Sequence, residues 1–175
     1  CEGILGPCRD LGDVLEVRCL NRILRFVQPA YAKADKGYVE WEADPRHLEI
    51  LTSQVGLRAD SKRLGQPSIK MEKDADERPL SADGRTLYRS ATMRLSYVAQ
   101  DRADIQYACK ELARHRQEPT EWDLPQLKRA VRYMIGCGRV AQRFEQQDVP
   151  GRLVVCTDSD FAGCVRTRKS TSCCM

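Results

Sequence analysis

The chain has 175 residues, of which 42% are hydrophobic and 31% charged, and its mean hydropathy is −0.53. This composition is typical of a globular protein with one large domain, or with a compact domain and part of a second. No apolar run approaches the roughly 20 residues of a bilayer span, and the first residues do not resemble a secretory signal. We therefore expect an intracellular chain with no membrane partner, in a compartment that the sequence does not specify. Its start at Cys1 suggests a cut product or a partial gene.

The net charge of +4 is unevenly distributed. Residues 1–84 hold 13 basic and 15 acidic side chains, whereas residues 85–175 hold 16 and 10. A basic surplus in the second half is compatible with a surface that faces nucleic acid, and equally with a solvated helix surface.

Nine cysteines are spread along the chain without a Cys-x-x-Cys pair, and the two histidines are not grouped with them. This pattern disfavours a zinc site. The odd number of cysteines, several of them in apolar segments, favours reduced thiols that fill the core. A redox or metal protein centred on Cys164, Cys173 and Cys174 is a minor alternative, because adjacent cysteines rarely hold one tetrahedral metal without further ligands.

The first half predicts a small β region and one short helix. Residues 14–27 alternate apolar and polar side chains, and Tyr38–Glu42 follows a polar loop, so these segments predict the two strands of a hairpin. Asp44 and Pro45 predict the start of a helix over residues 45–55, because Pro is tolerated in a first helical turn.

Residues 58–84 are polar, contain Pro67 and Pro79 and include a run of charges, so they predict a surface connection and the main hinge of the chain. Apolar residues at helical spacing predict three helices beyond it. These helices are expected over residues 86–99, 104–114 and 120–136.

The third predicted helix is the clearest element of the sequence. Thr120 followed by Asp123 resembles a capping box, and apolar residues recur on one face as far as Gly136. The opposite side carries three basic residues, which could face a phosphate backbone or simply water. They are Lys128, Arg129 and Arg132.

After this helix, Val140–Glu145 has strand character, and Leu153–Cys156 predicts a short buried strand that ends in an Asp-Ser-Asp sequence. Residues 164–175 would start another strand. Asp158 stands where Mg²⁺-dependent nucleases place a ligand, because a strand end holds the carboxylate rigidly and leaves the ion open to phosphate. The competing interpretation is a solvated turn in which the aspartate caps the strand.

Three ordered blocks occupy the second half of the chain: Leu87–Tyr97 with Asp101–Ala108, then Leu127–Gly136, then Thr157–Gly163 with Arg168–Ser172. The first block is similar to a Tyr-Arg helix followed by Arg-Pro-Asp-Ile. The second is similar to a helix that ends in Arg-Tyr-Leu-Lys-Gly. The third is similar to Ser-Asp-Ala-Asp-Trp-Ala-Gly followed by Arg-Lys-Ser-Thr-Ser-Gly. These are patterns of the copia-type LTR retrotransposon Pol polyprotein. The chain resembles the part of Pol that runs from the C-terminal reverse transcriptase segment into the start of ribonuclease H.

The resemblance implies an α/β fold with an N-terminal β-hairpin plus helix, a three-helix connection segment and the first strands of a truncated ribonuclease-H-like sheet. It divides the chain into the end of a reverse-transcriptase-like region (1–57), a polar connection (58–84), a helical connection region (85–143) and an incomplete ribonuclease-H-like domain (144–175). It also implies an RNA–DNA hybrid or other nucleic acid, and the rest of Pol, as partners.

In this family Asp158 would be the first of four carboxylates that hold two Mg²⁺ ions, which activate a water and stabilise the leaving oxygen. The chain departs from the family patterns at four positions, where Pro, Leu, Trp and Gly are usual. The residues found there are Ala103, Met134, Phe161 and Cys173.

The polymerase signature Tyr-x-Asp-Asp does not occur in the sequence, and the remaining nuclease carboxylates would have to follow Met175. We therefore expect a Pol fragment that is catalytically incomplete. The alternative is a non-catalytic nucleic-acid-binding module, which requires several basic residues to converge on one surface. Its candidates are Arg85, Arg89, Arg94, Lys128, Arg129 and Arg132.

Overall fold

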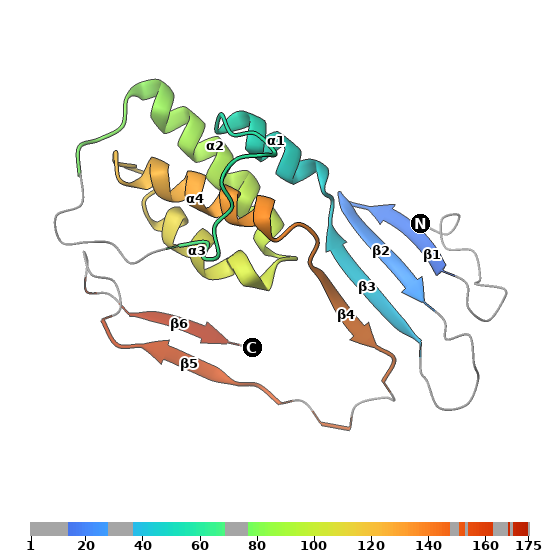
Figure 1. The fold of residues 1–175 in the computed structure, drawn as a ribbon. Helices are drawn as coiled ribbons and strands as arrows, with labels where there is room; N and C mark the ends of the chain where they lie inside the picture. Colours follow the sequence, from blue (N-terminus) through green and yellow to red (C-terminus); the bar gives the residue numbers. More distant parts are fainter. Residues whose placement is uncertain are drawn as a thin grey trace.

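The computed structural model describes residues 14–27, 37–68, 77–147, 151–152, 154–162, 168 and 170–174. Over these residues the fold is α/β, as predicted, with four helices, a four-stranded antiparallel sheet and a separate two-stranded ribbon (Figure 1). The sheet projects from one end of the helical layer. None of the described helices combines the length and apolar character that a bilayer crossing requires.

The four-stranded sheet has the order β1-β2-β3-β4, and each neighbouring pair is antiparallel. Its strands are β1 (Val14–Cys19), β2 (Arg22–Val27), β3 (Tyr38–Ala43) and β4 (Ala141–Glu145). The predicted hairpin between residues 14–27 and 38–42 exists as the β2–β3 pair. β4 then adds to β3, so segments about one hundred residues apart in sequence share one sheet.

The prediction of residues 14–27 as a single strand is wrong. A two-residue turn at Leu20 and Asn21 divides them into β1 and β2. Both residues have positive φ, 49° and 57°, which is the turn geometry that matches the twist of a tight hairpin. Asn adopts this conformation readily, but Leu rarely does and no Gly marks the turn, so the local sequence gives a weak signal.

The predicted helices are confirmed, with shifted ends. They are α1 (Arg46–Gln54), α2 (Ala82–Ala99), α3 (Ala103–Arg114) and α4 (Asp123–Gly136). Each turns its apolar face into one shared core, whose fully buried members include Leu51, Tyr88, Leu95, Ile105 and Leu127. The Tyr88 hydroxyl donates to the Leu112 carbonyl at 2.8 Å, so the polar atom of this large buried side chain has a partner.

The described cysteines are free thiols. Cys109 is 5% exposed in the helical core, as expected for a core-filling thiol, and its Sγ lies 3.2 Å from the Ser96 Oγ. Cys19 and Cys137 are half-buried, and Cys156 is exposed. The alternative centred on Cys164, Cys173 and Cys174 lies outside the described side chains.

The C-terminal ribbon consists of β5 (Thr157–Asp160) and β6 (Thr171–Cys174), which pair antiparallel. β6 lies within the segment predicted to start another strand. The prediction of a buried strand at Leu153–Cys156 is wrong, because Val154 and Val155 are 61% and 56% exposed outside any strand and β5 begins at Thr157. A short apolar run marks a buried strand only where another layer covers it, and the sequence does not reveal that layer.

The boundaries predicted for the four regions of the chain stay predictions. Two packing features cross them. β4 runs through the boundary placed between residues 143 and 144, and α1, from the first region, packs against α2 and α4 of the helical connection.

A buried carboxylate marks the start of α1. Asp44 is 1% exposed, and its Oδ1 accepts the Arg46 backbone N–H at 3.0 Å. Asp44 therefore caps the first turn as predicted, although the N-cap position falls on Pro45, whose side chain makes no capping bond. The Asp44 Oδ2 pairs with the Arg46 guanidinium at 2.6 Å and with Arg18 at 3.5 Å. Hydrogen bonds from Arg46 outweigh burial and lower the pKa of Asp44 to about 2.

A second buried carboxylate joins the sheet to the helices. Asp101, 3% exposed just beyond α2, accepts the Arg22 Nε at 2.9 and 2.8 Å through its two oxygens. The Trp41 indole donates to the same carboxylate at 2.8 Å. The Arg22 guanidinium also lies 5.5 Å from the centre of the Trp41 ring and 5.1 Å from that of Tyr97. Residues from β2, β3 and α2 therefore meet at Asp101.

Asp101→Asn should lower the free energy of unfolding by about 3 kcal/mol, because it removes the counter-charge of the largely buried Arg22 and leaves that cation unpaired. Urea unfolding followed by tryptophan fluorescence measures the change. The matched control is Asp60→Asn at an exposed site. Equal unfolding midpoints for the two variants would contradict the anchoring role of Asp101.

Asp44→Asn should reduce the acid sensitivity of the fold. A carboxyl whose pKa is lower in the folded state contributes stability that is present above its unfolded pKa and is lost as pH falls through the folded pKa. For Asp44 this window runs from 3.8 down to about 2. Thermal unfolding across this range should show a smaller loss of stability in Asp44→Asn than in the parent or in Asp60→Asn. Parallel curves would show that the Asp44 pairs contribute nothing.

Candidate nucleic-acid interface

The start of α4 is fixed by a buried carboxylate. Asp123 is 2% exposed, and its Oδ2 accepts the backbone N–H and the hydroxyl of Thr120 at 2.7 and 2.8 Å. Its Oδ1 lies 2.6 Å from the His115 Nδ1. Burial alone would raise the pKa of Asp123, but the hydrogen bonds from His115 and Thr120 lower it. The predicted capping box therefore exists in modified form, because the Thr120 hydroxyl donates to Asp123 and does not accept from the helix.

The other end of α4 is held by a buried arginine. Arg102 is 4% exposed and donates to the carbonyls of Cys137 and Gly138 at 3.0 and 3.1 Å, just beyond the last residue of α4. Its guanidinium also forms a two-bond pair with Asp104 at 2.9 and 2.7 Å. The first turn of α3 is thereby tied to the end of α4. Ala103 occupies the first position of α3, where a proline would also be tolerated.

With both ends fixed, the direction of the outer face of α4 is fixed as well. Leu127, Ala130, Val131 and Met134 point into the core, and the three predicted binding residues lie on the other side of the helix as half-buried side chains. These residues, named here the α4 basic face, are Lys128, Arg129 and Arg132.

The α4 basic face has no counter-charge in the part of the chain that the structure describes. None of its three members makes an ion pair or a hydrogen bond with another described residue. The Nε atoms of Arg129 and Arg132 are shielded from solvent and unpartnered among the same residues. The helix itself carries one acidic residue, Asp123, which points to Thr120 and His115. Neither guanidinium group is therefore engaged by an acceptor among the described residues.

The basic residues of α2 do not join this face through any described contact. Arg89 donates to the carbonyls of Arg116 and Gln117 at 3.0 and 2.5 Å, in the turn after α3. Arg94 instead lies 3.5 Å from the His47 Nδ1 on α1, and Arg85 is exposed. The described contacts therefore do not bring the α2 arginines to the α4 basic face, and the alternative of a binding module with several of the six candidates on one surface stays a prediction.

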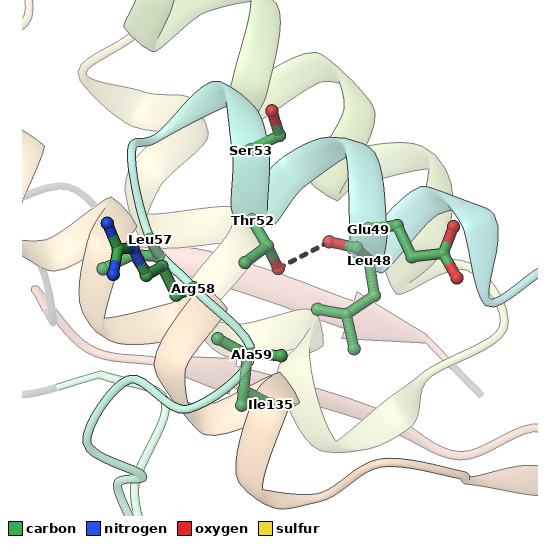
Figure 2. A pocket seen from close by; sticks show the side chains of 8 residues that line it. All are labelled: Leu48, Glu49, Thr52, Ser53, Leu57, Arg58, Ala59 and Ile135. Atoms are coloured by element: carbon green, nitrogen blue, oxygen red, sulfur yellow. Dashed lines mark hydrogen bonds between the residues drawn. The ribbon is translucent and has the colours of Figure 1, made fainter.

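A cavity of about 510 Å³ opens between α1, residues 57–59 and the end of α4 (Figure 2). Its lining mixes apolar side chains such as Leu48 and Ile135 with the oppositely charged Glu49 and Arg58. The Thr52 hydroxyl is already engaged, because it donates to the Leu48 carbonyl at 2.7 Å. This lining matches no single class of ligand.

Asp158 is exposed on β5, and its Oδ1 accepts the Ser159 backbone N–H at 2.7 Å. This bond reaches the next residue within β5, whereas the predicted Asx turn would engage the residue two positions on. The described residues contain no group of three or more side chains placed to hold a metal ion, and the Asp160 side chain is not among them. One exposed carboxylate does not fit a two-metal site, because Mg²⁺ takes six oxygen ligands and two ions need several carboxylates. The metal role of Asp158 stays a prediction.

Comparison with known proteins gives one relative. Over 85 residues, 49% of this chain, the sequence is 35% identical to the uncharacterized mitochondrial protein AtMg00810 of Arabidopsis thaliana. The chain covers about a third of that protein, since the match takes in 35% of its length. No protein-family model and no solved structure matches the chain.

Arg102→Lys should lower the free energy of unfolding by about 2 kcal/mol although it conserves charge, because an ammonium cannot replace the guanidinium fork that serves a carboxylate and two carbonyls together. Chemical unfolding measures the loss. Arg152→Lys, at an exposed position, is the matched control and should be neutral. If both variants unfold at the same denaturant concentration, Arg102 does not hold α3 to α4.

Proposed function

We propose that the chain is a segment of a copia-type retrotransposon Pol polyprotein, running from the C-terminal part of the reverse transcriptase into the start of ribonuclease H. The three sequence blocks support this origin, and so does the 35% identity to a relative over 85 residues. Each block forms a different part of the fold. The first forms α2, α3 and the Asp101 and Arg102 contacts, the second forms α4, and the third forms the β5–β6 ribbon.

Within this segment, the α4 basic face binds the phosphate backbone of a nucleic-acid duplex. The contrast with the other arginines carries this proposal. Arg22, Arg25 and Arg139 pair with Asp101, Glu42 or Glu40 at 2.5 to 2.9 Å and hold the sheet together. Arg129 and Arg132 have no such partner among the described residues. Cations that contribute nothing to the fold are the ones expected to contact an external anion.

The proposed binding does not depend on base sequence. Long cationic side chains on a helix face read phosphates and carry no base information. Each neutralised phosphate releases condensed counterions, so the logarithm of the binding constant should fall with the logarithm of salt concentration by about 0.9 for every contact. This slope is the property that separates phosphate binding from a merely solvated basic surface.

We further propose that this chain has no nuclease activity by itself. Asp158 supplies one carboxylate, and completion of a Mg²⁺ site requires carboxylates from elsewhere in the polyprotein. The RNA–DNA hybrid is then a ligand of this segment, and its cleavage belongs to a larger assembly.

The double variant Arg129→Gln and Arg132→Gln should bind a 20-base-pair RNA–DNA hybrid more weakly, with a salt slope reduced by about 1.8, because two phosphate contacts are lost. Fluorescence anisotropy at several salt concentrations measures both quantities. The matched control is Arg85→Gln and Arg152→Gln, which removes the same charge from two exposed positions. Equal slopes for the two double variants would contradict a binding role for α4.

Incubation of the chain with a labelled hybrid and Mg²⁺ should give no cleavage, either with Asp158 or with Asp158→Asn, because one carboxylate cannot hold two metal ions. Gel electrophoresis of the labelled strand is the measurement. Cleavage by the parent that disappears in Asp158→Asn would show a complete metal site and would refute the proposal.

A further inference from the structure

The segment from residue 57 to residue 68 connects α1 to the rest of the chain and is held against the helical layer. Leu57 packs on the core, and its N–H donates to the Thr52 carbonyl at 2.9 Å. Arg58 and Ser61 then close a turn through two bonds, from the Arg58 N–H to the Ser61 Oγ at 2.9 Å and from the Ser61 N–H to the Arg58 carbonyl at 3.0 Å. Figure 2 shows the first residues of this segment between α1 and Ile135 of α4.

The same segment touches α4 at a glycine. A Cβ placed on Gly136, the last residue of α4, would lie 3.2 Å from the Arg63 Cβ and 3.7 Å from the Leu64 carbonyl oxygen. The first distance is tighter than ordinary van der Waals contact, so a Cβ at position 136 would require Arg63 to shift by a few tenths of an ångström. The absence of a side chain at Gly136 therefore allows Arg63 to approach the helix.

Gly136 lies on the side of α4 that bears the arginines. Arg129, Arg132 and Gly136 stand at positions i, i+3 and i+7, which fall on one face of a helix. The Cβ of Arg63 therefore lies beside the last position of this row. Arg63 is exposed and has no ion-pair or hydrogen-bond partner among the described residues.

We propose that Arg63 is a further phosphate-binding residue, which acts with Arg129 and Arg132 on one duplex, and that Gly136 is the residue that positions it. This inference rests on the proposed function of α4. The row from position 129 to position 136 spans about 10 Å at 1.5 Å per residue. At a rise of 3.4 Å per phosphate along a duplex, that length corresponds to about three intervals between successive phosphates of one strand. Three guanidinium groups in a row therefore suit a continuous phosphate backbone better than a single small anion.

Arg63→Gln should weaken hybrid binding and reduce the salt slope by about 0.9, equivalent to one lost contact. Arg85→Gln, which removes the same charge from an exposed position on α2, should leave the slope unchanged. Anisotropy titrations at several salt concentrations measure both. Thermal unfolding of both variants checks that neither changes the fold.

Gly136→Val provides a second test that conserves every charge. The added side chain should shift Arg63 and reduce the slope by at most the change seen in Arg63→Gln, while in the Arg63→Gln background it should cause no further change. A role of Gly136 in the fold alone would lower the unfolding temperature and leave the slope at its parent value, and that result would overturn the positioning role.

The outcomes separate this inference from the function on which it rests. If Arg129→Gln with Arg132→Gln reduces the slope while Arg63→Gln behaves like Arg85→Gln, the role of Arg63 is refuted and the α4 interface stands. If Arg63→Gln alone reduces the slope, the interface lies on the 57–68 segment, and the shared surface with α4 is refuted.

Discussion

The carboxylate of Asp101 is the contact on which the joining of the sheet to the helices depends. It receives three hydrogen bonds from the side chains of Arg22 and Trp41, which come from two different strands. The sheet has few other contacts with the helical core, whose fifteen buried residues all belong to helices or to the segments that flank them. Because Asp101 is almost completely buried, the geometry of its partners is tightly constrained.

Arg102, the next residue, extends this junction in the other direction. Its bonds to Asp104 and to the carbonyls beyond α4 hold α3 and α4 in a fixed relation. Asp123 does the same at the opposite end of α4 through Thr120 and His115. Buried charges that are fully paired in this way define one arrangement of the elements, because any displacement would leave a charge unpaired in the interior.

The distribution of paired and unpaired arginines connects the fold to the proposed function. On the sheet, Arg25 and Arg139 both contact Glu42, so the basic residues there are neutralised within the fold. On the outer face of α4, Arg129 and Arg132 lack such partners within the described residues. The second sequence block therefore supplies core residues on one side of a helix and free cations on the other, which is the arrangement that a rigid phosphate-binding surface requires.

The sequence alone does not reveal the structural role of the first sequence block. Asp101–Ala108 resembles a family pattern in the sequence, and its first two residues form the structural junction. Asp101 meets partners from β2 and β3, and Arg102 meets carbonyls beyond α4. An alternation of charged residues next to a helix start looks like any solvated turn, because burial is a property of the assembled fold.

The sequence by itself determined the four helices and the α/β class, because the spacing of apolar residues and local signals such as Asp44 and the Thr120 and Asp123 pair act over a few residues. Tertiary structure decided the features that join distant segments. These include the addition of β4 to β3, the exposure of Val154 and Val155, and the contact between Arg63 and Gly136. Pairing, burial and the choice of which cations are neutralised depend on residues far apart in the chain, and no local pattern encodes them.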